Sequence, residues 1–404
     1  MNIVYIHQYF ETPDQFGGLR SYQNSLHMIN QGHRVTMITG SGNYHSSDSR
    51  KRFEKRLVQR ENIHGIDVIW VDTVFQYHKT FLHRVLGFLV FMLLSTWVGL
   101  RQKADVVYVT SPPLTVVIPG FVISLFKRCP LAFEVRDIWP ESAVTAGVLK
   151  NPVLIRVAEF LERFAYRAAC RIVPVSEGIR DSLVERGFDR DKMRVVRHGA
   201  DLGYLTPDKA DGSFRRKYGL EGKFVAIYAG SFGNANGIDM LVKAAHILRD
   251  HESVSIVLLG DGKEKEQLVS MAEEYRLTNL VFADPVPKKE VAAAIGAADA
   301  GLMILRNAPT FKTVLPNKLL DYMACELPVI INFEGYASNI VTGAGAGLVV
   351  SPDSPEAIAA AIEQLSRDRA SCAAMGASGR ETVVRDYSRN ATVRDFERVI
   401  HEMV

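Results

Sequence analysis

Cysteine is scarce in this sequence, and its four cysteines are not arranged for cross-linking or metal binding. Cys129, Cys170, Cys325 and Cys372 are far apart and form no paired spacing. Zinc sites and disulfide frameworks both need such spacing, so neither is indicated. The sequence therefore predicts no metal site and suits a reducing compartment.

Apolar runs long enough to cross a membrane are also missing. Two apolar runs without charge stand out, at residues 85–100 and 113–126, and both are shorter than the about 20 apolar residues that a spanning helix needs. The first residues lack a basic segment ahead of an apolar one, so they predict a first strand and no signal peptide. We expect a cytoplasmic protein.

Nucleic-acid motifs and two familiar nucleotide-binding motifs are absent. The glycine-rich turn at residues 230–237 has neither the dinucleotide-binding spacing nor the Lys-Ser/Thr of a phosphate-binding loop. The formal net charge is +3, with 26 Lys and Arg against 18 Asp and Glu in residues 1–200 and 22 against 27 in residues 201–404. This modest excess does not predict nucleic acid as a partner, but the basic first half suits another anionic partner.

What the chain does contain is a regular alternation of strands and helices over 404 residues. The pattern predicts parallel α/β architecture, and the length suits two domains. Strands are predicted at residues 2–7, 35–39, 68–70, 106–110, 131–135, 171–174 and 193–197, and then at 224–228, 255–259, 280–282, 301–304 and 328–331. We therefore predict two tandem Rossmann-like domains facing across a cleft, with ligands beyond the carboxyl ends of the strands.

Residues 311–330 are the most informative segment, a loop that leads into a short helix and a buried strand. Pro316 stands where a first-turn proline is tolerated, and Lys318 and Asp321 lie on one side near the helix start. A helix start offers free N–H groups that suit a phosphate. The segment predicts a site for a nucleotide diphosphate-sugar, with an ordinary surface Lys–Asp pair as the alternative.

Three glycine-rich turns follow predicted strands, at residues 16–19, 230–237 and 259–262. Glycine lets the backbone approach a ligand closely, although a tight turn alone would explain each of them. The residues of these turns that we predict to contact the donor are Gly17, Gly18, Gly230, Gly233, Asn234, Gly260 and Asp261.

Polar and aromatic side chains crowd the end of the predicted strand at residues 131–135. They are Arg136, Asp137, Trp139 and Glu141. A carboxylate there could orient an acceptor hydroxyl, and an arginine could contact phosphate oxygens; a structural Arg–Asp pair is the alternative. His7, at the tip of the first strand, is more simply a hydrogen-bonded structural histidine than a catalytic one. We predict that His7, Trp139 and Glu141 lie on the acceptor side.

Both apolar runs are flanked by basic residues, which suits a helix lying in a membrane surface. The alternative is a helix buried against a sheet. Phe88, Phe91 and Trp97 favour a membrane-facing role for residues 85–100, whereas a buried helix is favoured for residues 113–126. The basic run at residues 50–56 is either a solvated or a membrane-facing segment.

An ordered set of short motifs spans nearly the whole chain, at residues 17–18, 32–35, 176–177, 198–201, 260–262, 298–299 and 320–330. Together they resemble the retaining family-4 glycosyltransferases of the GT-B fold. Residues 7–10, 135–140 and 316–318 resemble the O-antigen and capsule subgroup, particularly the bacterial L-fucosamine (N-acetyl-L-fucosaminyl) transferases that act on undecaprenyl-diphosphate-linked acceptors.

The resemblance implies a metal-independent enzyme, peripheral at the inner face of the bacterial inner membrane, with UDP-L-FucNAc as the expected donor and no cofactor. It implies an acceptor-binding domain over residues 1–205, a donor-binding domain over 206–386, and a C-terminal helix over 387–404 that crosses back to the first domain. Further donor contacts are implied at Thr313, Val314, Leu315, Asn317 and Asp321.

This sequence departs from the family pattern in three ways. The family's glutamate pair maps to Thr313 and Asp321, its diphosphate-binding Arg and Lys map near Gly233 and Asn236, and its acceptor-side His maps to Arg136. We therefore predict that Lys318, with Arg136, supplies the missing positive charge, and that Asp137 positions the acceptor.

Two other functions remain open. A non-hydrolysing UDP-sugar 2-epimerase shares the two-domain architecture, but it needs several acid–base residues in its cleft and no membrane patch. A non-catalytic, nucleotide-sugar-binding scaffold subunit of a polysaccharide complex would fit the missing glutamate and cations.

Overall fold

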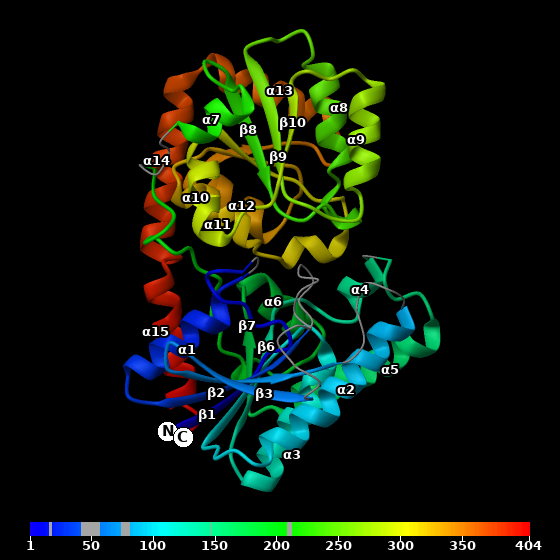
Figure 1. Ribbon diagram of the computed structural model, residues 1–404, viewed down its shortest axis with the longest axis vertical. Coiled ribbons are helices and arrows are strands. Elements are labelled where there is room, and N and C mark those ends of the chain that lie inside the picture. The colour runs from blue at the N-terminus through cyan, green and yellow to red at the C-terminus, as the bar shows by residue number, and fades with distance from the viewer. Residues whose placement is uncertain (16–17, 42–56, 74–80, 146, 208–211) are drawn as a thin grey trace. The chain divides into compact units, whose positions relative to one another are not determined.

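The computed structural model describes residues 1–15, 18–41, 57–73, 81–145, 147–207 and 212–404. These residues form two compact α/β units, one of Met1–Arg197 with Val393–Val404 and one of His198–Thr392 (Figure 1). Two Rossmann-like units in tandem were predicted, and this part of the prediction is confirmed. The first change of unit falls between residues 197 and 198, whereas the sequence placed it between 205 and 206.

The first unit is built on a seven-stranded sheet with the order β3-β4-β2-β1-β5-β6-β7. The strands are β1 (Asn2–Ile6), β2 (Arg34–Gly40), β3 (Val58–Ile63), β4 (Ile66–Val71), β5 (Val106–Thr110), β6 (Leu131–Val135) and β7 (Arg171–Pro174). All pairs are parallel except β3 with β4. The predicted strand at residues 193–197 was wrong, because only a single bridge joins Met193 to Ile172.

Alternating residues of β1 separate the two faces of this sheet. Ile3 and Tyr5 pack with α1 (Arg20–Asn30) and with the part of α15 (Arg389–His401) that follows Thr392, where Phe396 is fully buried. Val4 and Ile6 share a core with α2 (Phe81–Gly99), α3 (Val117–Lys127), α5 (Pro152–Ala168) and α6 (Glu177–Glu185). The short helix α4 (Glu141–Thr145) precedes α5.

The second unit is built on a six-stranded sheet with the order β10-β9-β8-β11-β12-β13. Its strands are all parallel: β8 (Phe224–Ala229), β9 (Val254–Leu259), β10 (Leu280–Ala283), β11 (Ala300–Met303), β12 (Val329–Ile331) and β13 (Gly347–Val349). Its helices are α7 (Ser213–Tyr218), α8 (Asp239–Ile247), α9 (Lys265–Glu274), α10 (Lys288–Gly296), α11 (Asn317–Ala324), α12 (Tyr336–Ala344), α13 (Pro355–Arg367) and α14 (Arg369–Asp386).

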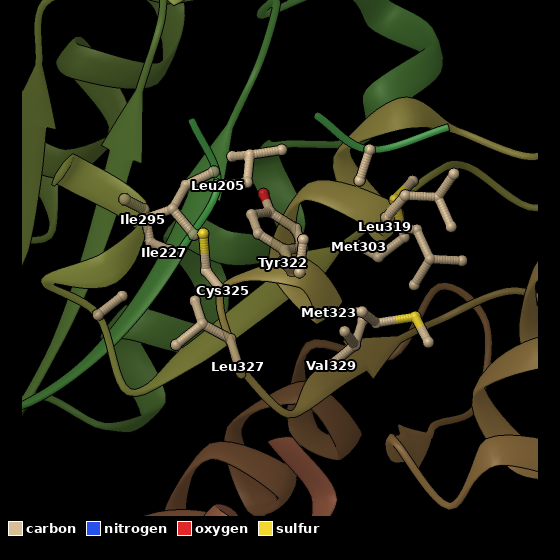
Figure 2. Close-up of a cluster of buried hydrophobic side chains, with 14 of the residues drawn as sticks. Leu205, Ile227, Ile295, Met303, Leu319, Tyr322, Met323, Cys325, Leu327 and Val329 are labelled. Atoms are coloured by element: carbon tan, nitrogen blue, oxygen red, sulfur yellow. The ribbon is translucent and has the colours of Figure 1, made fainter. Parts of the chain in front are cut away.

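Helix α11 is inserted deeply into the core of the second unit (Figure 2). Leu319, Tyr322 and Met323 are completely or almost completely buried. Gly301 of β11 allows this close packing, since an added Cβ would lie 2.4 Å from the Tyr322 ring. The Tyr322 hydroxyl accepts a hydrogen bond from the N–H of Ala229 at 2.8 Å. These contacts fix the first turn of α11 beside the carboxyl end of β8.

Candidate functional site

The turns after β8 and β9 pack directly on each other in the second unit. Gly260 has φ +151°, and an added Cβ would lie 1.9 Å from the carbonyl oxygen of Gly230. The N–H of Phe232 donates to the carbonyl of Asp261 at 2.8 Å. The Asp261 carboxylate accepts from the N–H of Gly262 at 2.8 Å, so it shapes this turn as the alternative interpretation proposed.

Lys318 lies in the first turn of α11 and reaches the end of β8. Its Nζ donates to the Tyr228 hydroxyl at 2.8 Å and lies 4.1 Å from the centroid of that ring. The Tyr228 hydroxyl donates in turn to the carbonyl of Ser231 at 2.9 Å. Burial raises the pKa of Tyr228 well above its usual value, so this phenol stays neutral and supplies a lone pair to the ammonium.

The charge of Lys318 is not balanced within the described part of the chain, where no carboxylate forms a salt bridge with it. Desolvation lowers the pKa of Lys318 to about 7. A surface pair with Asp321 is therefore not what the structure contains. The ammonium is also close to the backbone of Gly230, where an added Cβ would lie 3.1 Å from Nζ. An anion at this turn would restore the charged form of Lys318.

The start of α11 differs in one detail from the prediction. Pro316 has φ −68° and ψ 136° and precedes the first helical residue, so it does not lie in the first turn. The N–H of Leu319 bonds to the carbonyl of Pro316 at 3.1 Å. Among the described residues, the N–H groups of Asn317 and Lys318 have no acceptor, which leaves both available to an anion.

The other residues predicted in this segment lie close by along the chain. Thr313 ends a short 3₁₀ turn (Pro309–Thr313), and its hydroxyl donates to the carbonyl of Thr310 at 3.2 Å. Val314 is half-buried, whereas Leu315 and Asp321 are buried. A ligand would therefore meet Leu315 mainly through its backbone.

Arg306 was missed by the sequence analysis. Its Nε donates to the carbonyl of Asn234 at 2.8 Å, and its guanidinium forms an ion pair with Asp239 at 2.9 Å. Arg306 lies in the segment that follows β11. The fully buried Asn332 holds this segment in place, because its side chain bonds both the N–H and the carbonyl of Leu305 at 2.9 Å. These contacts of Arg306 stabilise the turn at residues 230–237, where the family's usual cations are missing. The position of Arg306 after a predicted strand is the sequence feature that could have identified it.

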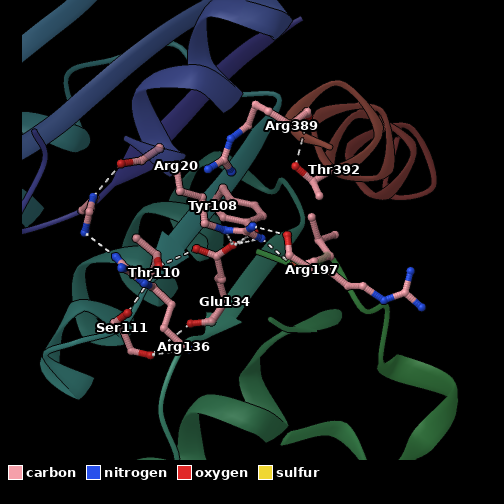
Figure 3. A network of polar contacts seen from close by, with 12 residues as sticks. Arg20, Tyr108, Thr110, Ser111, Glu134, Arg136, Arg197, Arg389 and Thr392 are labelled. Carbon is pink, nitrogen blue, oxygen red and sulfur yellow. Dashed lines mark hydrogen bonds and ion pairs between the residues drawn. The ribbon is translucent and has the colours of Figure 1, made fainter. Parts of the chain in front are cut away.

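In the first unit, a buried network of hydrogen bonds and an ion pair lies at the end of β6 (Figure 3). Arg20 and Glu134 form an ion pair at 2.7 Å, and both are almost fully buried. Glu134 also accepts from the hydroxyls of Tyr108 at 3.0 Å and Thr110 at 2.6 Å. Burial works to raise the pKa of Glu134, but Arg20 outweighs this effect and the pKa is lowered.

Arg20 has its remaining hydrogen bonds satisfied as well, since it donates to the carbonyls of Val196 at 2.7 Å and of Arg197 at 2.6 Å. The network therefore joins α1, β5, β6 and the segment after β7 into one framework. The sequence analysis missed Arg20, because its position at a helix start does not indicate that its partner is Glu134, more than 100 residues away.

His7 and Arg136 lie together at this edge of the sheet. The Arg136 guanidinium is 3.3 Å from Nε2 of His7, and Nδ1 of His7 is 2.7 Å from the Ser21 hydroxyl. Arginine can only donate, so Nε2 accepts and Nδ1 carries the proton. Burial, reinforced by the charge of Arg136, lowers the pKa of His7 well below its usual value. His7 is a neutral residue that orients Arg136.

Asp137 is half-buried and forms no hydrogen bond or ion pair with the residues that the structure describes. Burial raises the pKa of its carboxyl, and the charge of Arg136 acts in the opposite direction. The structural Arg–Asp pair considered above is therefore not formed. Asp137 is available to a hydroxyl donor.

The remaining predicted residues of the first unit are spread over several elements. Trp139 is half-buried against the core, and Glu141 is exposed at the start of α4. Gly18 is half-buried and precedes α1. Gly17 and the basic run at residues 50–56 lie outside the described residues.

Glu11 is a second residue that the sequence analysis missed. It follows β1, its side chain is buried, and its Oε2 has no hydrogen-bond partner among the described residues. Burial raises the pKa of its carboxyl to about 8, so at neutral pH it carries a proton that it can donate. No sequence pattern around it signals this state.

Helix α2 has one buried and one exposed side. Phe91 is fully buried in the core, so its predicted membrane-facing role was wrong. Phe88 is half-buried. Leu89, Leu93 and Trp97 recur every fourth residue and are 42%, 65% and 50% exposed, and Arg101 stacks over the Trp97 ring at 3.8 Å. In the described ranges, no helix has both the length and the apolarity to cross a membrane.

Two neighbouring helices expose apolar side chains as well. Leu125 and Phe126 at the end of α3 are 60% and 72% exposed, whereas Val117 and Ile123 are buried in the core, as predicted for residues 113–126. Val157 and Phe160 of α5, a helix whose surface the sequence analysis did not consider, are 58% and 72% exposed. Monomeric soluble proteins rarely expose apolar side chains in such groups.

Comparison with protein families finds a match in each half of the chain. Residues 17–199 match the Glycosyl transferase 4-like domain, and residues 211–382 match Glycosyl transferases group 1. WbjE of Pseudomonas aeruginosa, described as a glycosyltransferase, is 24% identical over 296 residues, which are 71% of this chain and 73% of WbjE.

A second relative covers almost the full length. WcaI of Escherichia coli, described as a glycosyl transferase of colanic acid biosynthesis, is 22% identical over 388 residues, or 93% of this chain and 91% of WcaI. Among solved structures, HepE of Anabaena in complex with UDP and glucose has a TM-score of 0.76 at 16% identity, with both chains covered completely. At this identity the structural likeness shows a shared fold.

Proposed function

We propose that the chain is a glycosyltransferase of the GT-B type and that it transfers a sugar from a nucleotide donor to a lipid-linked saccharide with retention of configuration. Its matches to a glycosyl transferase 4-like domain followed by a glycosyl transferases group 1 domain support this assignment. WcaI, described as acting in colanic acid biosynthesis, supports a role in surface polysaccharide synthesis. HepE binds UDP and glucose, which supports a UDP-sugar donor. The resemblance at residues 7–10, 135–140 and 316–318 favours UDP-N-acetyl-L-fucosamine and an undecaprenyl-diphosphate-linked acceptor.

The observation that carries the proposal is Lys318, a cation at the start of α11 for which the described residues provide no counter-ion. A donor diphosphate bound there would meet the ammonium and the N–H groups of Asn317 and Lys318. As the bond between the sugar and the diphosphate breaks, negative charge grows on the leaving phosphate oxygen. Fixed positive groups at that position stabilise the transition state more than the ground state.

Retention follows if the acceptor hydroxyl attacks on the face from which the diphosphate departs. The acceptor oxygen then forms the new glycosidic bond, and its proton passes to the leaving phosphate oxygen. No covalent bond to the enzyme is needed, and Lys318 supplies the charge for which other transferases use a metal ion.

The acceptor is assigned to the first unit. Asp137 has a carboxylate free to accept a hydrogen bond from the acceptor hydroxyl, and Arg136 is held by His7 beside it. The exposed stripe of Leu89, Leu93 and Trp97 would lie in the membrane surface that carries the lipid. Arg101, stacked on Trp97, would then be at the level of the headgroups.

The direct test is a transfer assay. Purified protein is incubated in a chelating buffer with UDP-, GDP- and dTDP-sugars and a synthetic lipid diphosphate bearing N-acetylglucosamine, and the products are identified by mass. We expect one UDP-sugar to give a disaccharide-lipid. Formation of an epimerised UDP-sugar without use of the acceptor would identify the epimerase alternative. Donor binding without transfer to any acceptor would favour a scaffold subunit.

A further inference from the structure

A cavity of about 420 Å³ lies in the first unit between the end of α5, the start of β7 and the end of α6. It opens at the amino ends of the strands, because Ile172 is the second residue of β7 and β7 runs parallel to β6. Arg136 and Asp137 follow the carboxyl end of β6, at the opposite edge of the sheet. The cavity is therefore separate from the acceptor residues discussed above. Its wall contains four cations and two aromatic rings: Arg163, Arg167, Arg186, Lys192, Tyr166 and Phe188.

Two of these cations already have hydrogen-bond partners within the protein. Arg186 donates to Glu162, a buried carboxylate, at 2.8 Å, and the Tyr166 hydroxyl donates to the same carboxylate at 3.2 Å. Lys192 donates to the carbonyls of Arg167 at 3.3 Å and of Ala169 at 3.2 Å, so it balances the negative end of α5.

The other two cations have no hydrogen-bond partner of this kind among the described residues, although the charge of Arg163 acts to lower the pKa of the nearby Glu162 carboxyl. The guanidinium groups of Arg163 and Arg167 form no hydrogen bond or ion pair with any residue that the structure describes. The one other carboxylate in the wall belongs to Asp189, which is exposed and accepts from the N–H of Asp191 at 2.9 Å. The cavity therefore has a surplus of positive charge and unused N–H donors arranged around an open volume, which suits a phosphate group.

The surface of α5 beside these arginines is apolar. Val153, Val157 and Phe160 are 64%, 58% and 72% exposed, and their spacing places them along one side of the helix. Arg156, Arg163 and Arg167 follow the adjacent side with the same periodicity. An apolar stripe flanked by a basic stripe is typical of helices that lie in a membrane interface.

We propose that this cavity binds the phosphate of an anionic phospholipid, with Arg163 and Arg167 contacting the phosphate oxygens while Val157 and Phe160 enter the acyl region. The inference extends the proposed membrane association and gives it a preference for anionic lipid. It concerns a lipid that holds the enzyme at the membrane, and neither the donor nor the acceptor takes part.

The test is flotation of the full chain with vesicles of phosphatidylcholine alone and vesicles that also contain phosphatidylglycerol. For the double variant Arg163→Gln/Arg167→Gln we expect partitioning onto the anionic vesicles to fall about 25-fold, or about fivefold for each lost cation near the surface. Partitioning onto pure phosphatidylcholine should not change. The matched control is Lys263→Gln/Arg276→Gln, which removes the same charge from exposed positions of the second unit and should retain anionic-vesicle binding.

A second variant separates a lipid from a free phosphate. Phe160→Ser should weaken partitioning onto both kinds of vesicle and leave the weak binding of inorganic phosphate, followed by calorimetry, as in the parent protein. The proposal would be overturned if the two double variants lost anionic-vesicle binding to the same extent, or if neither of them lost it. Tight phosphate binding together with unchanged flotation of Phe160→Ser would also overturn it, because the ligand would then be soluble. No sugar donor or acceptor is present, so these outcomes do not depend on glycosyl transfer.

Discussion

Each unit of this protein holds a desolvated cation near the carboxyl ends of its strands, but only one of the two cations is paired with a carboxylate of the described residues. In the first unit Arg20 is matched by Glu134 at 2.7 Å, and two backbone carbonyls take its remaining donors. In the second unit Lys318 has a phenol as its partner, and its pKa falls to about 7. Arg20 is almost fully buried and Lys318 is half-buried. Both cations are desolvated, and they differ in charge compensation.

The difference separates a structural role from a functional one. A buried ion pair with satisfied hydrogen bonds keeps several elements in register, and it offers nothing to a ligand. A desolvated ammonium without a carboxylate lowers the stability of the empty protein, so its presence needs another explanation. An anionic ligand provides that explanation, since it would supply the missing charge.

The largest expected effect is on the stability of the first unit. Arg20→Met leaves Glu134 buried and unpaired, which should reduce the free energy of unfolding by about 3–5 kcal/mol. Urea denaturation measures the change. The control Lys150→Met removes an exposed lysine and should change stability by less than about 0.5 kcal/mol. An Arg20→Met protein as stable as its parent would show that the network is not structural.

For the cation of the second unit we expect a loss of activity without a loss of stability. Lys318→Met should lower kcat at least about 100-fold, since it removes one group that stabilises charge in the transition state. It should not lower stability, because the variant buries no unpaired charge. Lys312→Met, an exposed lysine in the preceding turn, is the control and should retain full activity. A Lys318→Met enzyme with full kcat would refute the assigned role.

Tyr228→Phe sharpens the comparison by removing the one hydrogen-bond partner of Lys318 that the structure describes, while keeping the ring beneath the ammonium. The loss of a hydrogen bond to a charged group corresponds to about a tenfold decrease in kcat/KM. Steady-state kinetics with the donor varied would measure it. Unchanged kcat/KM would mean that the phenol does not position Lys318.

A further effect of Lys318 is on the pH dependence of stability. Between pH 7 and pH 10.5, the unfolded chain keeps the Lys318 proton that the folded protein has released. The unfolded state then binds more protons, so the stability of the parent should rise with pH relative to Lys318→Met across this window. Urea denaturation of both proteins at several pH values tests the sign. A difference that falls with pH would contradict the lowered pKa.

The fold could be predicted where local pattern determined it. The strands β5, β6 and β7 have the predicted bounds because each is a short run of mostly apolar residues. The strand β3 was missed because only its first and last residues are apolar and none of its residues is buried. It is recognised as a strand only through its antiparallel pairing with β4. Phe91 was misplaced because α2 is apolar on all sides, so periodicity could not separate its buried side from its exposed side.

The candidate site could be predicted only as far as single segments allowed. The sequence identified Lys318 from its place at a helix start, but its contact with Tyr228 spans 90 residues and arises only when β8 and α11 pack together. The partners of Arg20 and the contacts of Arg306 have the same origin. Such contacts are set by tertiary packing, which no local pattern encodes.

The central claim is that the charge of Lys318 serves a nucleotide-sugar diphosphate, and the pH dependence of donor binding tests it most directly. The dissociation constant of the donor, measured by calorimetry, should be constant below pH 7 and rise about tenfold for each pH unit above it. In Lys318→Arg the rise should disappear, because the guanidinium stays charged. A dissociation constant that does not change with pH in the parent protein, or the same rise in both proteins, would contradict the account.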